Sequence, residues 1–303
     1  MILENAFKKI FWRISYLARW CGVPLLSPLI PARIRRIFGF EYPFLQALPK
    51  KCSALKMRIA KTDGGYRLTM PPFSFLLPAR GFAEGDFFDI AYPFVSSCAF
   101  AQNVIRTMDC DGPYERAGAF LSEGDYVVDA GANIGLFSVV ASKKVGMRGA
   151  VFACEPIEDV LFYLRDAVEH NRCTNVSILP YAVGETEAVV SFNVALGDNF
   201  EGSSKYFHAH GEKRVSVQQK RLDDLVDRGI IARVDFIKAD IEGAERDLLM
   251  GAWKTIKQFK PKMALRTYHR PDDPEVLRAA LKKIVPEYHI LQEKKTLYAW
   301  IEA

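Results

Sequence analysis

Buried-strand patterns and helical patterns alternate along the C-terminal part of the chain, and this alternation restricts the fold more than any other feature. Apolar runs of strand length recur with little polar alternation, and amphipathic stretches separate most of them. Strands of this kind are buried on both faces of a parallel sheet, and the helices between them provide the cover. The expected strands lie at 126–130, 150–156, 176–183, 234–240 and 262–268, and the expected helices at 133–145, 157–171, 222–229, from Ala244 onward and at 274–285.

Two closing strands, 288–293 and 297–302, have no helix between them. A short connection joins antiparallel strands, so we expect the last strand to run antiparallel at the end of the sheet. The fold class is therefore α/β: a Rossmann-like, seven-stranded, mostly parallel sheet with its last strand antiparallel, preceded by an N-terminal α+β cap. Residues 188–196 and 214–222 predict a separate β pair, and 56–70 predict a hairpin.

The pattern divides the chain into three parts. Residues 1–50 form a basic amphipathic segment with a proline-rich connector, 51–110 a cap or substrate region, and 111–303 the cofactor-binding domain. Half of the residues are hydrophobic and a quarter are charged, which is typical of a folded protein and excludes disorder. Six cysteines without a CxxC pair indicate a reduced, cytoplasmic protein without a structural zinc site.

Basic charge is concentrated in residues 1–40, which carry seven lysines and arginines against Glu4 alone, whereas the whole chain carries +5. The remainder is nearly neutral, so the composition does not indicate a nucleic-acid-binding protein. The apolar stripe of this segment predicts a helix that packs on the protein body or at a homodimer interface, or that lies on the anionic inner face of a membrane. Its apolar runs are too short to span a bilayer.

The loop after the strand 126–130 has the character of a cofactor loop. Gly131 and Gly135 flank Asn133, and Asp129 ends the strand. A dinucleotide pyrophosphate requires bare backbone amides, and a glycine stands at the second position of that fingerprint. Asn133 obstructs that approach, and the Asp129 carboxylate repels phosphate. The loop therefore favours a phosphate-free, positively charged ligand, for which S-adenosylmethionine is the candidate; the alternative is that both glycines serve only a tight turn.

Glu155 ends the next strand, at the place where an acidic residue binds the ribose hydroxyls of a nucleotide cofactor. Asp240 ends a third strand, so acids recur at the edge of the sheet where ligands bind. Glu242 and Glu245 follow three residues apart at the start of a helix, where acids also simply stabilise the helix dipole. Asp240 and Glu242 are suitable ligands for Mg²⁺, although nothing in their spacing requires a metal.

Four segments resemble the FkbM-type methyltransferases, a class I S-adenosylmethionine-dependent family. In chain order they are VVDAGANIG, VFACEP, LDDL and FIKADIEGAE. The resemblance covers about residues 111–270. It implies O-methylation, often of a sugar or another hydroxyl group. It also implies roles for individual residues: the loop residues and Asp129 at the methionine and sulfonium end, Glu155 at the ribose, and Asp240, Glu242 and Glu245 at the reacting end. Family members often carry a glutamate near the position of Arg266, so this chain departs from the family there.

A hydroxyl group is a poor nucleophile, so a general base within hydrogen-bond reach is expected. His269 follows a strand and is the preferred candidate, together with Asp240 as the second catalytic residue; His208 and His210 are alternatives in a loop. Glu115 follows a Gly-Pro turn, either over the cofactor loop or at a plain domain junction.

The sequence thus predicts an S-adenosylmethionine-dependent O-methyltransferase with a saccharide or glycan acceptor, which a basic amphipathic N-terminus suits if the acceptor is linked to a lipid. Two alternatives stay open. An NAD-dependent sugar oxidoreductase is disfavoured by Asn133. A non-catalytic protein that binds a glycan or a partner on the same fold is kept open by Arg266.

Overall fold

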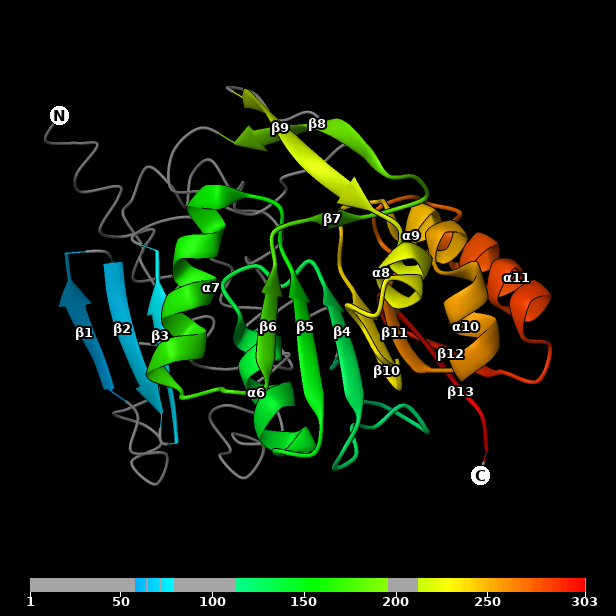
Figure 1. The fold of residues 1–303 in the computed structure, drawn as a ribbon, viewed down its shortest axis with the longest axis horizontal. Coiled ribbons are helices and arrows are strands. Elements are labelled where there is room, and N and C mark those ends of the chain that lie inside the picture. Colours follow the sequence, from blue (N-terminus) through cyan, green and yellow to red (C-terminus); the bar gives the residue numbers. More distant parts are fainter. Residues whose placement is uncertain (1–57, 64, 71, 79–112, 196–211, 303) are drawn as a thin grey trace, which may run out of the picture. The chain divides into compact units, whose positions relative to one another are not determined.

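The computed structural model describes residues 58–63, 65–70, 72–78, 113–195 and 212–302 (Figure 1). They belong to one compact unit, formed by Arg58–Ala83 and Asp111–Ala303. The expectations for the N-terminal helix, for most of the cap and for His208 and His210 lie outside the described residues.

A seven-stranded sheet forms the centre of this unit, with the strand order β12-β13-β11-β10-β4-β5-β6. Its strands are β4 (Tyr126–Ala130), β5 (Ala150–Cys154), β6 (Val176–Leu179), β10 (Phe236–Ala239), β11 (Lys262–Arg266), β12 (His289–Glu293) and β13 (Thr296–Trp300). The five strands from β11 to β6 pair in parallel, and β13 is antiparallel to both of its neighbours. The predicted α/β class, strand number and antiparallel last strand are confirmed.

The position expected for the last strand is wrong. β13 lies between β11 and β12, and β12 forms the edge. The helix that follows β11 carries the chain to the outermost position first, and the tight turn after Glu293 then returns it into the gap.

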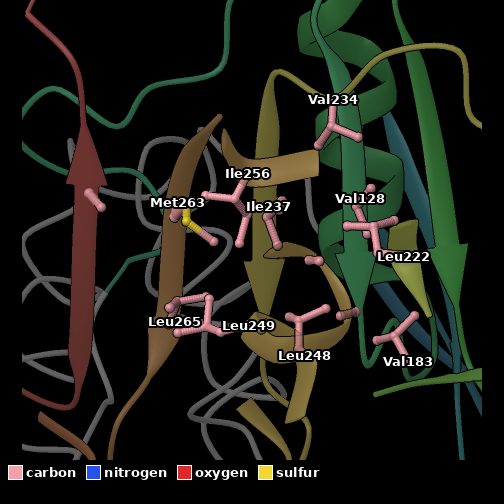
Figure 2. Packing of buried hydrophobic residues seen from close by; sticks show 14 of the residues in the cluster. Val128, Val183, Leu222, Val234, Ile237, Leu248, Leu249, Ile256, Met263 and Leu265 are labelled. Carbon is pink, nitrogen blue, oxygen red and sulfur yellow. The ribbon is translucent and has the colours of Figure 1, made fainter. Parts of the chain in front are cut away.

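Helices cover both faces of the sheet (Figure 1). They are α6 (Leu136–Val145), α7 (Glu158–His170), α8 (Leu222–Asp227), α9 (Glu245–Gly251), α10 (Trp253–Phe259) and α11 (Asp273–Ile284). On one face, side chains of β4, β10 and β11 pack against the last four helices. Figure 2 shows Ile237 and Met263 beside Ile256, and Val128 beside Leu222. The other face packs against α6 and α7, where Leu161 and Leu164 meet Ala153 of β5.

Two predicted elements are divided in the structure. The strand expected at 176–183 ends at Leu179, and β7 (Ala182–Val183) instead joins β9 (Glu212–Lys220) and β8 (Ala188–Ala195) in a small separate sheet. The helix expected from Ala244 is interrupted between α9 and α10. A side chain at Gly251 would lie 1.9 Å from the carbonyl oxygen of Gly184, so only glycine allows this close approach.

The predicted hairpin is confirmed and is extended by one strand. β1 (Arg58–Thr62), β2 (Gly65–Met70) and β3 (Phe73–Leu77) form an antiparallel sheet. Arg67 binds the carboxylate of Asp166 on α7 through two nitrogens, at 2.5 and 2.8 Å. In the described part of the chain, no helix is long and apolar enough to cross a membrane.

Candidate functional site

Successive side chains of β4, β10 and β11 point to opposite faces of the sheet, one of which carries the apolar core and the other the candidate site. Val128, Ile237 and Leu265 belong to the large apolar cluster on one face of the sheet. Side chains one residue away point to the opposite face, because successive side chains of a strand alternate. Asp129 and Lys238, which are paired in register, are therefore buried on that opposite face, at the carboxyl ends of β4 and β10.

Asp129 lies beneath the loop that joins β4 to α6. It is fully buried, accepts a hydrogen bond from the Ser138 hydroxyl at 2.6 Å, and forms an ion pair with Lys238 at 3.0 Å. Lys238 also donates to the carbonyl oxygen of Gly131 at 2.6 Å. A buried charge is tolerated when it is paired and hydrogen-bonded, so this pair fixes the loop to the sheet and is largely neutral as a unit.

The loop itself uses its backbone amides internally. The N–H groups of Gly131 and Ala132 both donate to the carbonyl oxygen of Cys154 at 3.0 Å. The next amide, that of Asn133, donates to Oε2 of Glu155 at 3.0 Å. Three successive amides are thus already bound within the protein. Asn133 has φ = 50°, a conformation that asparagine adopts more readily than most residues.

Both loop glycines are required by close approaches of the protein to itself. A Cβ atom at Gly131 would lie 2.0 Å from the carbonyl oxygen of Asp240, and one at Gly135 would lie 2.7 Å from Leu164 on α7. Both residues also have positive φ angles, 74° and 88°. Close packing and positive φ angles thus account for both glycines, and a contact of their backbone with a ligand stays a prediction.

Glu155 is held at the end of β5 by two backbone amides. Its Oε2 accepts from Asn133 and its Oε1 from Ile157, each at 3.0 Å. Burial raises the pKa of this carboxyl group to about 7, even though the two amides and Lys238 act in the opposite direction. Glu155 is thus a buried acceptor of hydrogen bonds, fixed in orientation, at the edge of the sheet where ligands bind.

Asp240 is surrounded by polar groups at the end of β10. The Tyr114 hydroxyl donates to its Oδ2 at 2.8 Å, and the Tyr268 hydroxyl donates to its Oδ1 at 3.3 Å. The guanidinium group of Arg266 lies 3.5 Å from Oδ2 and stacks on the Tyr114 ring at 4.1 Å. Burial alone would raise the pKa of Asp240, but the positive charges of Arg266, Lys238 and His269 outweigh it and hold the pKa below its usual range.

His269 follows β11, as expected, and it lies among three carboxylates. Its Nδ1 lies 3.1 Å from Glu245, and its Nε2 lies 3.5 Å from Glu242 and 3.7 Å from Asp240. The side chain is only 3% exposed. Burial lowers the pKa of His269, but hydrogen bonding and attraction to Glu245, with Asp240 and Glu242, dominate and raise it to about 9. Both ring nitrogens thus face protein carboxylates, a geometry that does not favour the predicted role of general base.

Glu115 lies away from the cofactor loop, whereas two residues that the sequence analysis did not name, Tyr114 and Lys238, belong to the site. Glu115 binds Lys144 and the amide of Leu121 near the C-terminal end of α6, whereas the cofactor loop precedes its N-terminal end. Its assignment to the cofactor stays a prediction that this position does not favour. The adjacent Tyr114 reaches the site instead. Lys238 was also missed, although a lone lysine within the buried run FIKA is a signal for a buried ion pair.

Among the described residues, one group could hold a metal ion: single donor atoms of Asp240, Glu245 and His269 all lie within 4.8 Å of one another. This group includes Asp240 of the predicted Mg²⁺ ligands but replaces Glu242 by Glu245 and adds a histidine.

Comparisons with known proteins agree with this architecture. Residues 129–289 match the family model described as the Methyltransferase FkbM domain. The chain is 27% identical over 195 residues to the methyltransferase sdnD of Sordaria araneosa, covering 52% of this chain and 72% of that protein. It is 26% identical over 186 residues to the AMB antimetabolite synthetase AmbE of Pseudomonas aeruginosa, covering 49% of this chain but only 8% of that protein.

Solved structures include the methyltransferase FkbM of Methylobacillus flagellatus, with 21% identity and a TM-score of 0.47, covering 73% of this chain and 56% of that one. Fibrillarin of Aeropyrum pernix, solved in complex with natively bound S-adenosyl-L-methionine, has 13% identity and a TM-score of 0.39, covering 80% of this chain and 96% of that one. The family match spans more than half of this chain and includes the cofactor loop, Glu155, Asp240 and His269. The chain belongs to the FkbM methyltransferase domain family.

Proposed function

We propose that this protein is an S-adenosylmethionine-dependent O-methyltransferase whose acceptor is a hydroxyl group of a saccharide or glycan. Membership of the FkbM family supports the reaction class. The cofactor is supported by the chemistry of the loop, and the acceptor by the resemblance of the motifs and by the polar groups at the end of β10.

One observation carries the choice of cofactor: the loop amides are not available for phosphate. Those of Gly131 and Ala132 donate to Cys154, and that of Asn133 donates to Glu155. A pyrophosphate at the start of a helix is bound by such amides. A loop that uses them internally, next to a buried carboxylate, instead suits a ligand without phosphate.

The remaining groups suit the parts of S-adenosylmethionine. Glu155 can accept hydrogen bonds from two ribose hydroxyls while the amides of Asn133 and Ile157 hold it in place. The Oδ1 atom of Asn133 is buried and has no hydrogen-bond partner among the described residues, so it is suited to accept from the ammonium group of the cofactor. Unpaired buried acceptors are costly, and a donating ligand removes that cost.

In the proposed reaction, the methyl group moves from the sulfonium sulfur to the acceptor oxygen. The C–S bond breaks as the O–C bond forms, the sulfur keeps the electron pair of the broken bond, and the hydroxyl proton is released. Asp240 is the residue best placed to orient the hydroxyl, because its carboxylate lies at the sheet edge and is held ionised by neighbouring cations. Tyr268, whose side chain remains partly exposed while it donates to Asp240, is suited to contact the face of a sugar ring.

The two alternative functions predict different ligands. An NAD-dependent oxidoreductase needs loop amides that bind a pyrophosphate. A non-catalytic glycan-binding protein on this fold needs no cofactor at all, and the buried Arg266 beside Asp240 is the feature that favours it. A binding measurement with S-adenosylmethionine and with NAD therefore distinguishes the methyltransferase, the oxidoreductase and the non-catalytic protein.

The decisive experiment is calorimetric titration of the full-length protein with S-adenosylmethionine and, separately, with NAD. We expect binding of the first and none of the second. The variant Glu155→Gln should weaken S-adenosylmethionine binding by about 10- to 100-fold, because a hydrogen bond to a charged group is worth about 1.5–3 kcal/mol. Glu158→Gln is the matched control, since Glu158 is exposed and pairs only with Arg165 among the described contacts. Binding of NAD without S-adenosylmethionine would overturn the proposal.

A further inference from the structure

We propose that Asp240, Glu245 and His269 form a binding site for one divalent transition-metal ion. The ion would lie at the end of β10, beside the carboxylate to which we assign the acceptor hydroxyl. Its part in methyl transfer rests on the proposed function, whereas binding of the ion does not and can be measured separately.

The spacing of the donor atoms is suitable for a shared ion. One donor atom from each of the three residues lies within 4.8 Å of the others. Nδ1 of His269 and Oε1 of Glu245 are 3.1 Å apart. Two ligands that each lie about 2.0–2.2 Å from an ion, at roughly a right angle, are separated by about 3 Å. This separation also fits a hydrogen bond, so the ion would take the place of the proton between these two atoms. Asp240, whose Oδ1 lies 3.7 Å from Nε2, would turn toward the Nδ1 side to complete the site.

A second observation concerns Glu245 itself. Its side chain is fully buried at the start of α9. Oε1 accepts from the amide of Ile241 at 2.9 Å, but Oε2 has no hydrogen-bond partner among the described residues. A buried carboxylate oxygen without a donor is strongly unfavourable, and a cation bound to the carboxylate relieves this cost.

The charge of the surroundings also favours a dication. Asp240, Glu242 and Glu245 bring three negative charges around His269, and Arg266 brings one positive charge. The next buried charges, Lys238 and Asp129 on β10 and β4, form an ion pair and largely cancel. The charges named here sum to −2 when the imidazole is neutral, so a dication that displaces the imidazole proton would balance them.

The donor set indicates the class of metal. Imidazole nitrogen suits zinc, iron and related transition metals, whereas magnesium prefers oxygen ligands and keeps several waters. One imidazole with two carboxylates therefore favours Zn²⁺, Mn²⁺, Fe²⁺ or Co²⁺ over the Mg²⁺ that Asp240 and Glu242 alone would suit. Glu242 is partly exposed and lies 3.5 Å from the other ring nitrogen of His269, where it can orient the ring.

Titration of the chelator-treated, full-length protein with Co²⁺ tests the site, since its visible absorption spectrum reports the coordination of the ion. Bound metal is measured in parallel by elemental analysis. We expect one tightly bound equivalent, displaced by Zn²⁺. His269→Gln should weaken binding at least tenfold. His289→Gln is the matched control, because His289 is an exposed histidine that also faces a carboxylate, that of Glu302 at 3.7 Å.

The metal site and the proposed methyltransferase function can fail independently in these experiments. Equal Co²⁺ binding by wild type and His269→Gln would overturn the metal site, as would loss of binding in His208→Gln or His210→Gln instead. If His269→Gln does not fold, the electron paramagnetic resonance spectrum of Cu²⁺-loaded wild type decides: coupling to a single imidazole nitrogen is expected, and its absence refutes the site. S-adenosylmethionine titration of the metal-free protein tests the proposed function independently.

Discussion

Burial of Glu155 should destabilise the folded protein above neutral pH, and removal of its charge should reverse this. In the folded protein its pKa is raised from 4.5 to about 7 by burial. Between these two values the folded state holds a proton that the unfolded chain has released, so the free energy of unfolding falls as the pH rises. One pKa unit corresponds to about 1.4 kcal/mol, so the contribution lost across this window is about 3 kcal/mol.

Urea unfolding of wild type and Glu155→Gln across pH 5 to pH 8.5 measures this contribution, in the absence of cofactor. The difference in unfolding free energy between the two proteins should change by about 2–3 kcal/mol over the range, with wild type losing stability relative to the variant as the pH rises. Contributions of groups that do not interact with Glu155 cancel in this difference. Glu158→Gln should run parallel to wild type. Parallel profiles for wild type and Glu155→Gln would refute the reasoning, because they would mean that Glu155 ionises freely in the folded state.

Three further predictions concern the support of the site. Lys238→Met should cost about 3–5 kcal/mol of unfolding free energy by leaving Asp129 buried and unpaired, and the double variant with Asp129→Asn should recover much of it in the same urea assay. Gly131→Ala should lower the thermal midpoint by several degrees or prevent folding, because its Cβ would meet the carbonyl oxygen of Asp240. Tyr114→Phe should keep S-adenosylmethionine affinity within a few-fold but reduce kcat in a turnover assay, since it removes a hydrogen bond that orients Asp240.

The sheet and its acidic edge follow from local pattern. Apolar runs of strand length followed by helical periodicity predicted β4, β5, β10 and β11, because a strand that is buried on both faces of a parallel sheet has a nearly continuous apolar sequence. The acids at the ends of β4, β5 and β10 were found for the same reason: a polar residue that ends an apolar run lies at the edge. Such signals depend only on neighbours in the chain.

Contacts between segments that are distant in the chain have no local sequence pattern, so they could not be predicted in this way. Tyr114 reaches Asp240 across 126 residues, and no spacing in the sequence relates the two. The position of β13 inside the sheet depends on where α11 delivers the chain, which is decided by packing. His269 was predicted from its place after a strand, but its contacts with Glu245 at 3.1 Å and with Asp240 at 3.7 Å depend on how β10, α9 and β11 pack together.

Asn133 marks the point where sequence and structure give different reasons for the same conclusion. The sequence suggests that its side chain obstructs a pyrophosphate, whereas the structure shows that the amides around it are already bound to Cys154 and Glu155. If the amides decide, Asn133→Gly should not create NAD binding. The variant should stay within about 1 kcal/mol of wild-type stability, because φ = 50° suits glycine, and should bind S-adenosylmethionine about fivefold more weakly for want of the buried Oδ1 acceptor. Calorimetry with both ligands measures this. Gain of NAD affinity would show that the side chain, and not the occupied backbone, excludes the dinucleotide.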